Sequence, residues 1–243
     1  LAFHGSGGTG PGMAALTNLN NAAEDNGFIA VYPDAINHEW SFGKLPALGG
    51  IDDVGFISAL LDTLGTSLKL DPKRVYATGL SDGGFFAALL ACQRADRIAA
   101  LAEVGATMST LQAEVCAPSH PMPALLIHGT ADPVVAFSGG SKSGISLLSA
   151  PANAARWAAL AGCAATPAVT TLPDLAQDGT SIVQSTYGGC QAGAAVIFDA
   201  VQDGGHTWPG GAQYLPVSYI GKTSHNLNAS QAIWDFFQQH PHP

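Results

Sequence analysis

A Gly-x-Ser-x-Gly motif, Gly79-Leu80-Ser81-Asp82-Gly83, is the feature of this sequence best suited to do chemistry. It lies between a strand-like segment, residues 74–78, and a helix-like segment that starts near Gly83. A strand-to-helix turn this tight needs glycine on both sides, because a Cβ there would clash. The turn holds the Ser81 hydroxyl at a helix N-terminus, where the helix dipole favours developing negative charge. The motif therefore predicts that Ser81 is a nucleophile, the alternative being an ordinary glycine-rich turn.

A serine nucleophile needs a base to take its proton and an acid to orient that base. In hydrolases with this turn the acid and then the base follow the serine, each on a loop after a strand. Asp132 follows the predicted strand at residues 124–128, and His206 follows the predicted strand at residues 195–201. We therefore predict that Asp132 is the acid and His206 the base.

Other acids and histidines fit this arrangement less well. Asp174 and Asp178 lie between two strands that look antiparallel, and Asp203 is too near His206 in sequence to brace its ring easily. His225, in a polar loop, is the one serious alternative base. The remaining histidines are given non-catalytic roles: His4 and His128 as hydrogen-bonded structural residues, His240 and His242 as solvated residues of the C-terminal tail.

A serine that attacks an ester or amide carbonyl also needs an oxyanion hole, which is made of two backbone N–H groups. We predict that one comes from Asp82, directly after the nucleophile, and the other from Ser6 in the loop His4-Gly5-Ser6-Gly7-Gly8. A glycine-rich loop can also hold phosphate, but no Lys-Ser or Lys-Thr follows this one. Trp40 and Trp208 are candidates to line the substrate pocket, with ordinary packing as the alternative for each. No cluster of His, Cys and carboxylates has metal-ligand spacing, so we predict neither metal nor cofactor.

Alternating strand and helix patterns surround these residues. Strands are expected at residues 1–4, 28–32, 74–78, 98–104, 124–128, 169–172, 182–186 and 195–201, and helices at residues 13–23, 54–68, 85–94, 153–160 and 230–239. A long loop is expected at residues 33–51. This pattern predicts an α/β fold with a mostly parallel sheet covered by helices on both faces. Ligands of such sheets bind beyond the carboxyl ends of the strands, where the predicted catalytic residues fall.

Composition limits the class of protein. The 243 residues fit a single domain, with apolar residues at 47%. Only 11% are charged, against roughly 25% in an ordinary domain. A net charge of −9 with no basic run excludes a nucleic-acid partner. The longest apolar stretch has 8 residues, against roughly 20 for a membrane span. The chain starts as if inside a strand, so we expect that a leader and upstream strands are missing from it.

Four cysteines, at positions 92, 116, 163 and 190, show no C-x-x-C spacing. An even number without metal spacing in a weakly charged chain favours two disulfides and an oxidising compartment. Three full pairings are possible, and four free thiols are the alternative. We choose the nearest-neighbour pairing, Cys92–Cys116 and Cys163–Cys190.

The sequence resembles the esterase PHB (polyhydroxybutyrate) depolymerase family, which overlaps feruloyl and acetylxylan esterases of carbohydrate esterase family one. The similar segments extend over nearly the whole chain in the expected order: His4-Gly5-Ser6-Gly7-Gly8, Val31-Tyr32-Pro33-Asp34, Asp52-Asp53-Val54-Gly55-Phe56, Gly79-Leu80-Ser81, His128-Gly129-Thr130-Ala131-Asp132, Ala155-Arg156-Trp157-Ala158 with Gly162-Cys163, and Gly204-Gly205-His206-Thr207-Trp208-Pro209-Gly210. The resemblance implies an α/β-hydrolase fold, secretion, and a metal-independent serine mechanism with Ser81, Asp132 and His206 as nucleophile, acid and base.

Asp82 departs from the family, which often has an uncharged residue there. A carboxylate beside an oxyanion would oppose catalysis, so we expect the Asp82 side chain to turn away toward the helix N-terminus.

The resemblance predicts an extracellular serine esterase that acts on hydroxyalkanoate polyester. Feruloyl or acetylxylan esters of the plant cell wall are the alternative substrates, and a non-catalytic polymer-binding module is the alternative class. The connection from Gly105 to Pro123 is too short for a large lid. Leu215, Val217, Tyr219 and Ile220 follow the predicted base and are expected to form an apolar rim around an open site.

Overall fold

Three central strands are buried at every position, on both of their faces. They are β2 (Tyr76–Leu80), β3 (Ala100–Val104) and β4 (Ala124–Gly129). Strands with two apolar faces belong in a parallel sheet with helices on either side. The computed structural model, which describes residues 1–42, 50–142 and 144–243, has this architecture.

The main sheet in the described residues has seven strands in the order β1-β2-β3-β4-β9-β8-β7. Its other members are β1 (Ala2–Phe3), β7 (Ala168–Thr171), β8 (Ser181–Tyr187) and β9 (Val196–Gln202). Pairing is parallel from β1 to β9, and antiparallel between β9, β8 and β7. A separate hairpin pairs β5 (Gly140–Lys142) with β6 (Ile145–Leu147). The predicted mostly parallel sheet is confirmed.

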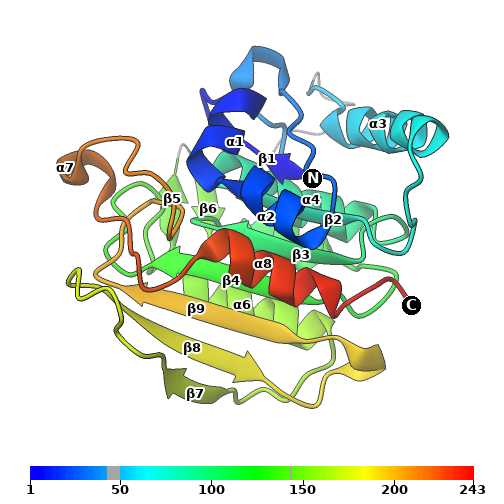
Figure 1. Cartoon of the computed structure of the whole chain (residues 1–243). Helices are drawn as coiled ribbons and strands as arrows, with labels where there is room; N and C mark the ends of the chain where they lie inside the picture. The colour runs from blue at the N-terminus through cyan, green and yellow to red at the C-terminus, as the bar shows by residue number, and fades with distance from the viewer. Residues whose placement is uncertain (43–49, 143) are drawn as a thin grey trace.

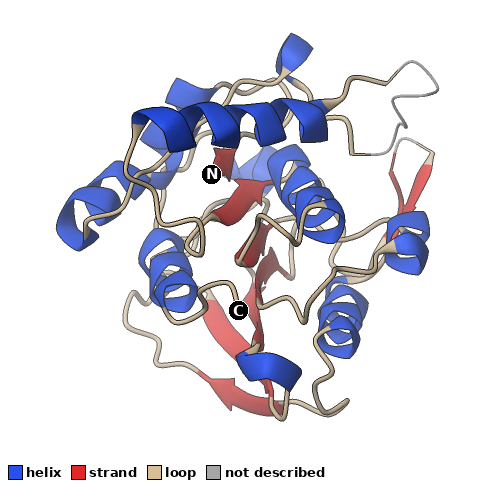
Figure 2. Cartoon of the chain, turned by 90° about the vertical axis from the view of Figure 1, so that its right-hand side faces the viewer, coloured by secondary structure: helices blue, strands red, loops and turns tan. Residues whose placement is uncertain are grey.

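Helices cover both faces of this sheet. They are α1 (Gly10–Thr17), α2 (Leu19–Asn26), α3 (Asp53–Ser67), α4 (Asp82–Gln93), α5 (Thr110–Val115), α6 (Ala150–Leu160), α7 (Val217–Ile220) and α8 (Ala229–Gln238). Side chains of α3, α4 and α6 join one apolar cluster with the sheet, and those of α1, α2 and α8 join a second. Figure 1 shows α8 in front of the sheet and α6 behind it, and Figure 2 shows the strands passing between the two layers.

Alternation along the strands assigns their side chains to the two clusters. On β4, Leu126 packs into the cluster of α6, while Leu125 and Ile127 pack into the cluster of α8. Each fully buried side chain of this size stabilises the fold by about 1.5–3 kcal/mol. The sheet is therefore a rigid base from which the loops at its carboxyl edge project.

The main differences from the sequence prediction lie near the N-terminus. The strand predicted at residues 28–32 is wrong: this segment is extended beside β1 but makes no ladder, and Ile29 is 53% exposed. One bond, from the Ala2 N–H to the Val31 carbonyl, joins it to β1, which has only two residues to offer. The helix predicted at residues 13–23 is split at Asn18, whose φ of 55° ends α1. Residues 43–49 of the predicted long loop lie outside the described residues.

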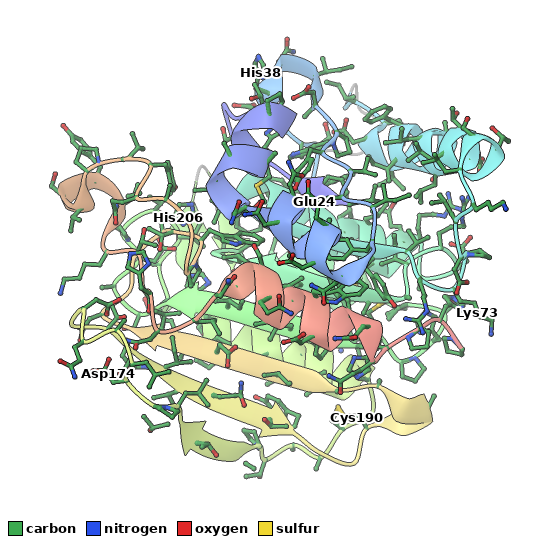
Figure 3. The ribbon with its side chains drawn as sticks, in the orientation of Figure 1. Glu24, His38, Lys73, Asp174, Cys190 and His206 are labelled. Carbon is green, nitrogen blue, oxygen red and sulfur yellow. A yellow bond between two sulfur atoms is a disulfide. The ribbon has the colours of Figure 1, made fainter. Side chains whose placement is uncertain are left out.

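The two predicted disulfides are present. Cys92–Cys116 joins the last turn of α4 to the end of α5, and Cys163–Cys190 joins the end of α6 to the loop after β8. Cys190 lies at the end of the sheet opposite His206 (Figure 3). Among the described residues, no helix is both long and apolar enough to cross a membrane.

Candidate active site

Ser81 occupies a strained turn between β2 and α4. Its backbone has φ 55° and ψ −119°, a strained conformation that non-glycine residues rarely adopt. Such conformations are found mainly at functional sites. The Ser81 N–H donates to the Val104 carbonyl at 2.9 Å, and the Ser81 carbonyl accepts from the N–H of Gly84 and of Phe85. These bonds hold the turn at the carboxyl ends of β2 and β3, as the sequence motif predicts.

Glycine allows three backbone segments to meet around this turn. A Cβ added to Gly83 would collide with the carbonyl groups of Phe3 and His4, so α4 packs directly on the end of β1. A Cβ on Gly5 would lie 3.6 Å from the Cβ of Ser81. The glycine loop, residues 5–8, therefore lies next to the nucleophile.

Asp132 and His206 lie together beyond the ends of β4 and β9. His206 Nδ1 and Asp132 Oδ2 are 2.7 Å apart, and both side chains are buried. The other carboxylate oxygen, Oδ1, accepts the N–H groups of Val134 at 2.7 Å and Val135 at 2.8 Å. This pairing places the imidazole proton on Nδ1 and leaves Nε2 as the basic nitrogen. His206 lies at the end of the sheet to which the arrowheads of β4 and β9 point (Figure 3).

The base lies beside the strand end that holds the nucleophile. The Ser81 N–H is bonded to Val104, and the next residue, Gly105, lies against the His206 ring. A Cβ on Gly105 would lie 3.2 Å from His206 Nδ1. The structure therefore brings the three predicted residues to one edge of the sheet, in the order that the sequence predicts.

The acid and base loops are also packed against each other. The Ala131 N–H donates to the Gly204 carbonyl at 2.9 Å, and a Cβ on Gly129 would collide with that same carbonyl. A Cβ on Gly205 would collide with the carbonyl of Ile220. Because the two loops meet through backbone, the Asp132–His206 distance is determined by main-chain packing.

The alternative base and acids lie elsewhere. His225 is exposed, and its N–H bonds to Asp178 at 2.6 Å, while the Asp178 carboxylate also accepts from Thr180. Asp174 accepts the Gln177 N–H within its own loop. None of these bonds involves Asp132 or His206.

His128 is buried behind the acid. Its Nε2 donates to the Val135 carbonyl at 2.8 Å and lies 3.6 Å from Asp132 Oδ2. Burial lowers the pKa of this imidazole, so it stays neutral near pH 7. His128 therefore has the structural role that we predicted.

The tail histidines are bonded to the protein, so the prediction that they are solvated is wrong. His240 Nδ1 donates to the Phe236 carbonyl at 2.7 Å, and His242 Nε2 donates to the Ala95 carbonyl at 2.9 Å. Both bonds attach the tail to the helix α8 and to the end of α4.

Ser6 and Asp82 flank the nucleophile on two different loops. Ser6 is in a turn closed by the bond from Gly8 N–H to the Gly5 carbonyl at 2.9 Å, with Gly7 at φ 73°. Asp82 is the first residue of α4, where backbone N–H groups point out of the helix end. We expected the Asp82 carboxylate to turn toward its own helix N-terminus, but its Oδ2 accepts the Trp40 N–H at 2.7 Å.

The assignment of Trp40 and Trp208 to the substrate pocket is wrong. Their residues are 3% and 0% exposed. The Trp40 ring stacks on Phe86 at 4.7 Å between ring centroids, and Trp208 donates its Nε1–H to Ser230 Oγ at 3.0 Å. Both rings pack in the interior, which was the alternative for each.

Three of the four residues expected to form an apolar rim are exposed. Leu215, Val217 and Tyr219 are 48%, 51% and 71% exposed, as expected of a rim, but Ile220 is buried. Tyr214, which the sequence analysis missed, donates its O–H to the His206 carbonyl at 3.0 Å. Burial, with the nearby Asp132 charge, raises the pKa of Tyr214 to about 12. No spacing rule connects Tyr214 with His206, so the sequence held no signal for it.

The described residues contain no group of three or more His, Cys, Asp or Glu side chains that could hold a metal ion.

Comparisons with known proteins relate this chain to esterases. The model of the family "Esterase PHB depolymerase" matches residues 1–110. "Putative esterase NocK" of Nocardia uniformis subsp. tsuyamanensis is 31% identical over 97% of this chain and 72% of its own length. "Feruloyl esterase B" of Piromyces equi is 30% identical over 76% of this chain, which spans only 35% of that longer protein.

A solved structure with a similar fold is the acetyl xylan esterase from Aspergillus awamori. Its TM-score is 0.65 at 17% identity, and the match covers 98% of this chain and 87% of that one. This likeness shows the α/β-hydrolase type of fold. Because the similarity to NocK extends over almost the whole chain and the family model includes the Ser81 turn, this chain belongs to the esterase PHB depolymerase family and is an ester hydrolase.

Proposed function

We propose that the chain hydrolyses carboxylic esters through a covalent acyl-enzyme on Ser81. The observation that carries this proposal is the buried 2.7 Å bond from His206 Nδ1 to Asp132 Oδ2, at the edge of the sheet where Ser81 sits in its strained turn. A base held in this tautomer by a buried carboxylate is the arrangement that a serine hydroxyl needs for activation.

The reaction proceeds in two steps. Ser81 Oγ attacks the ester carbonyl carbon while His206 Nε2 takes the hydroxyl proton, and the tetrahedral oxyanion accepts hydrogen bonds from the N–H groups of Ser6 and Asp82. The C–O bond to the alcohol then breaks, and His206 returns the proton to the leaving oxygen. In the second step His206 Nε2 takes a proton from water while the water oxygen attacks the acyl carbon. The bond from that carbon to Ser81 Oγ then breaks, and His206 returns the proton to Oγ, which releases the acid and restores the Ser81 hydroxyl. No cofactor enters either step.

We propose hydroxyalkanoate polyester or related apolar esters as the substrate. Three exposed apolar side chains, Leu215, Val217 and Tyr219, lie on and beside α7, the segment that follows the base. Residues 204–221 contain no Asp, Glu, Lys or Arg. In Figure 1, α7 projects at the same end of the molecule as the carboxyl ends of β4 and β9. An uncharged apolar surface at this end suits an apolar polymer chain better than a charged one.

The same proposal includes an extracellular location and a single catalytic domain over residues 1–243. The two disulfides support it, because such bonds persist in oxidising compartments.

Plant cell-wall esters are the second candidate, because two similar proteins carry the names feruloyl esterase and acetyl xylan esterase. An aromatic acyl group could pack on the same exposed Tyr219 and Leu215. The two candidates share the chemistry at Ser81 and differ in the acyl and alcohol groups.

The catalytic assignment is tested with p-nitrophenyl butyrate and three single variants. Ser81→Ala and His206→Ala should each lower kcat roughly 10⁴-fold with folding intact. His225→Ala is the matched control, since this exposed histidine contacts neither Asp132 nor His206, and its kcat should stay within about twofold. A folded His206→Ala variant with more than a tenth of the activity would contradict the proposal and transfer the base role to His225.

The substrate is tested by comparing kcat/KM on methyl ferulate and p-nitrophenyl butyrate with the clearing of a polyhydroxybutyrate emulsion. The polyester proposal predicts clearing and weak cleavage of methyl ferulate. Efficient cleavage of methyl ferulate with an emulsion that stays turbid would replace it with the cell-wall assignment.

A further inference from the structure

Asp82 has a buried carboxylate directly after the nucleophile, in a position where negative charge opposes oxyanion formation. One of its oxygens, Oδ2, accepts the backbone N–H of Trp40 at 2.7 Å. A carboxylate so near the reacting centre is unfavourable to the developing charge. Its presence therefore calls for a role that offsets this cost, and the hydrogen bond from the Trp40 N–H points to one.

Asp82 is bonded to the last residue of a segment, residues 34–40, that makes several hydrogen bonds with the glycine loop, residues 5–8. The Gly7 N–H donates to the His38 carbonyl at 2.9 Å, and His38 Nδ1 donates to the Gly8 carbonyl at 2.9 Å. Just beyond the loop, the Gly10 N–H donates to Asp34 Oδ1 at 2.6 Å. Hereafter residues 34–40 are called the clamp segment.

The strand end that leads into the glycine loop is held by the same segment. Trp40 donates its Nε1–H to the His4 carbonyl at 3.1 Å, and the Ala35 N–H donates to His4 Nε2 at 3.1 Å. His4 in turn donates from Nδ1 to the Gly5 carbonyl at 2.8 Å. His4 and Trp40 are both buried, so these bonds form without competition from solvent.

We propose that Asp82 is a positioning residue, whose carboxylate joins the nucleophile turn to the clamp segment and thereby sets the position of the Ser6 N–H in the oxyanion hole. This inference rests on the proposed function. The two donors of the oxyanion hole come from loops that are 76 residues apart in sequence, at positions 6 and 82. The Asp82–Trp40 bond makes them one unit, because the residue that offers one donor anchors the segment that holds the other.

The structure offers a matched control at the residue directly after the clamp segment. The next residue, Ser41, donates its N–H to Asp53 Oδ2, also at 2.7 Å. Asp53 is buried at the start of α3, away from the glycine loop. Loss of the Asp82 carboxylate removes the acceptor of the Trp40 N–H, and loss of the Asp53 carboxylate removes the acceptor of the Ser41 N–H. Each such loss costs about 1–3 kcal/mol of stability. Only loss of Asp82 should disturb the oxyanion hole.

The experiment compares Asp82→Ala, Asp82→Asn and Asp53→Ala on p-nitrophenyl acetate. Asp82→Ala should lower kcat roughly ten- to hundredfold, less than the 10²–10³ of a deleted oxyanion donor, with KM within about threefold. Asp82→Asn keeps an oxygen for the Trp40 N–H and should recover kcat to within about threefold of the unsubstituted chain. Asp53→Ala should keep kcat within about twofold although it unfolds at lower urea concentration.

A boronic acid supplies the second measurement, because it mimics the tetrahedral oxyanion on Ser81. Phenylboronic acid should inhibit Asp82→Ala more weakly than the unsubstituted chain, by the same factor as kcat falls. Equal inhibition of both, equal loss of kcat in Asp82→Ala and Asp53→Ala, or failure of Asp82→Asn to recover activity would each overturn the positioning role. Failure of the proposed function looks different: the unsubstituted chain itself would resist the boronic acid, and Ser81→Ala would stay active.

Discussion

At the scale of single residues, Asp132 accepts hydrogen bonds on both of its carboxylate oxygens. Oδ1 faces the N–H groups of Val134 and Val135, and Oδ2 faces His206. An amide in its place has only one oxygen. Two backbone donors outweigh one, so the oxygen should turn to them and the NH₂ group toward His206.

Asp132→Asn is therefore expected to reverse the tautomer of His206. Its Nδ1 would have to accept, the proton would move to Nε2, and the base could no longer take the Ser81 proton. The expected loss in kcat is roughly 10⁴-fold, with the free energy of unfolding nearly unchanged. Steady-state kinetics measure the loss in kcat, and the ¹⁵N chemical shifts of the His206 ring identify its tautomer. A normal tautomer with a large loss of activity would contradict the explanation.

The residues that carry chemistry could be predicted because catalysis restricts their type and order. Ser81, Asp132 and His206 each follow a strand, and the sheet brings strand ends together. Trp40 and Trp208 could not be placed in this way, since a tryptophan near a site in sequence can face the pocket or the interior. Tyr214 and the link from Asp82 to Trp40 depend on contacts between distant loops, which single-sequence patterns do not encode.

At the scale of elements, Glu103 joins β3 to α6. It is buried, and its two carboxylate oxygens accept the Asn153 Nδ2–H and the Trp157 Nε1–H, both at 2.7 Å. Asn153 also accepts the Met108 N–H, which fixes the connection after β3. Burial outweighs these two donors and raises the pKa of Glu103 from its ordinary 4.5 to about 8.

The stability of the fold should consequently fall as pH rises through this range. Between about pH 4.5 and 8 the folded state holds a proton on Glu103 that the unfolded state has lost, so the free energy of unfolding decreases by up to about 1.4 kcal/mol per pH unit. The contribution is fully present below pH 4.5 and lost above pH 8. Glu103→Gln does not titrate and should lack this slope, although its NH₂ group faces a donor and lowers stability by about 1–3 kcal/mol. Urea denaturation from pH 5 to 9 measures the free energy of unfolding of the unsubstituted chain and of Glu103→Gln. If this free energy changes with pH in the same way in the two proteins, the raised pKa of Glu103 is not the cause of the slope.

Prediction from sequence succeeded for the central strands and missed several short elements. The strands β2, β3 and β4 are apolar on both faces and were placed within two residues of their observed bounds. The segment at residues 28–32 is also mainly apolar, but the strand beside it has only two residues, so no ladder forms. The hairpin β5–β6 and the helices α5 and α7 are short, so too few residues repeat to give a periodicity.

At the scale of the whole molecule, the Cys163–Cys190 disulfide and the catalytic edge are separate features. Cys190 and His206 lie at opposite ends of the sheet (Figure 3). Replacing either cysteine pair by serine should lower the free energy of unfolding by about 3–4 kcal/mol, from loop closures of 24 and 27 residues. Because the Cys163–Cys190 bond is remote from the site, its loss should leave kcat at 25 °C unchanged. Activity that falls in parallel with stability in the serine variants would show that the two ends are coupled.

The backbone contact between the acid and base loops has a consequence for directed evolution. A side chain introduced at Gly129 collides with main-chain atoms of the base loop, and one introduced at Gly205 collides with main-chain atoms of Ile220 and Gly221. Libraries that randomise these two positions should therefore consist mostly of inactive clones. The neighbouring Leu215, Val217 and Tyr219 point into solvent and meet no such constraint. Diversity concentrated on those three codons should therefore change substrate preference at little cost in folded yield, and selection for new esters would most profitably begin there.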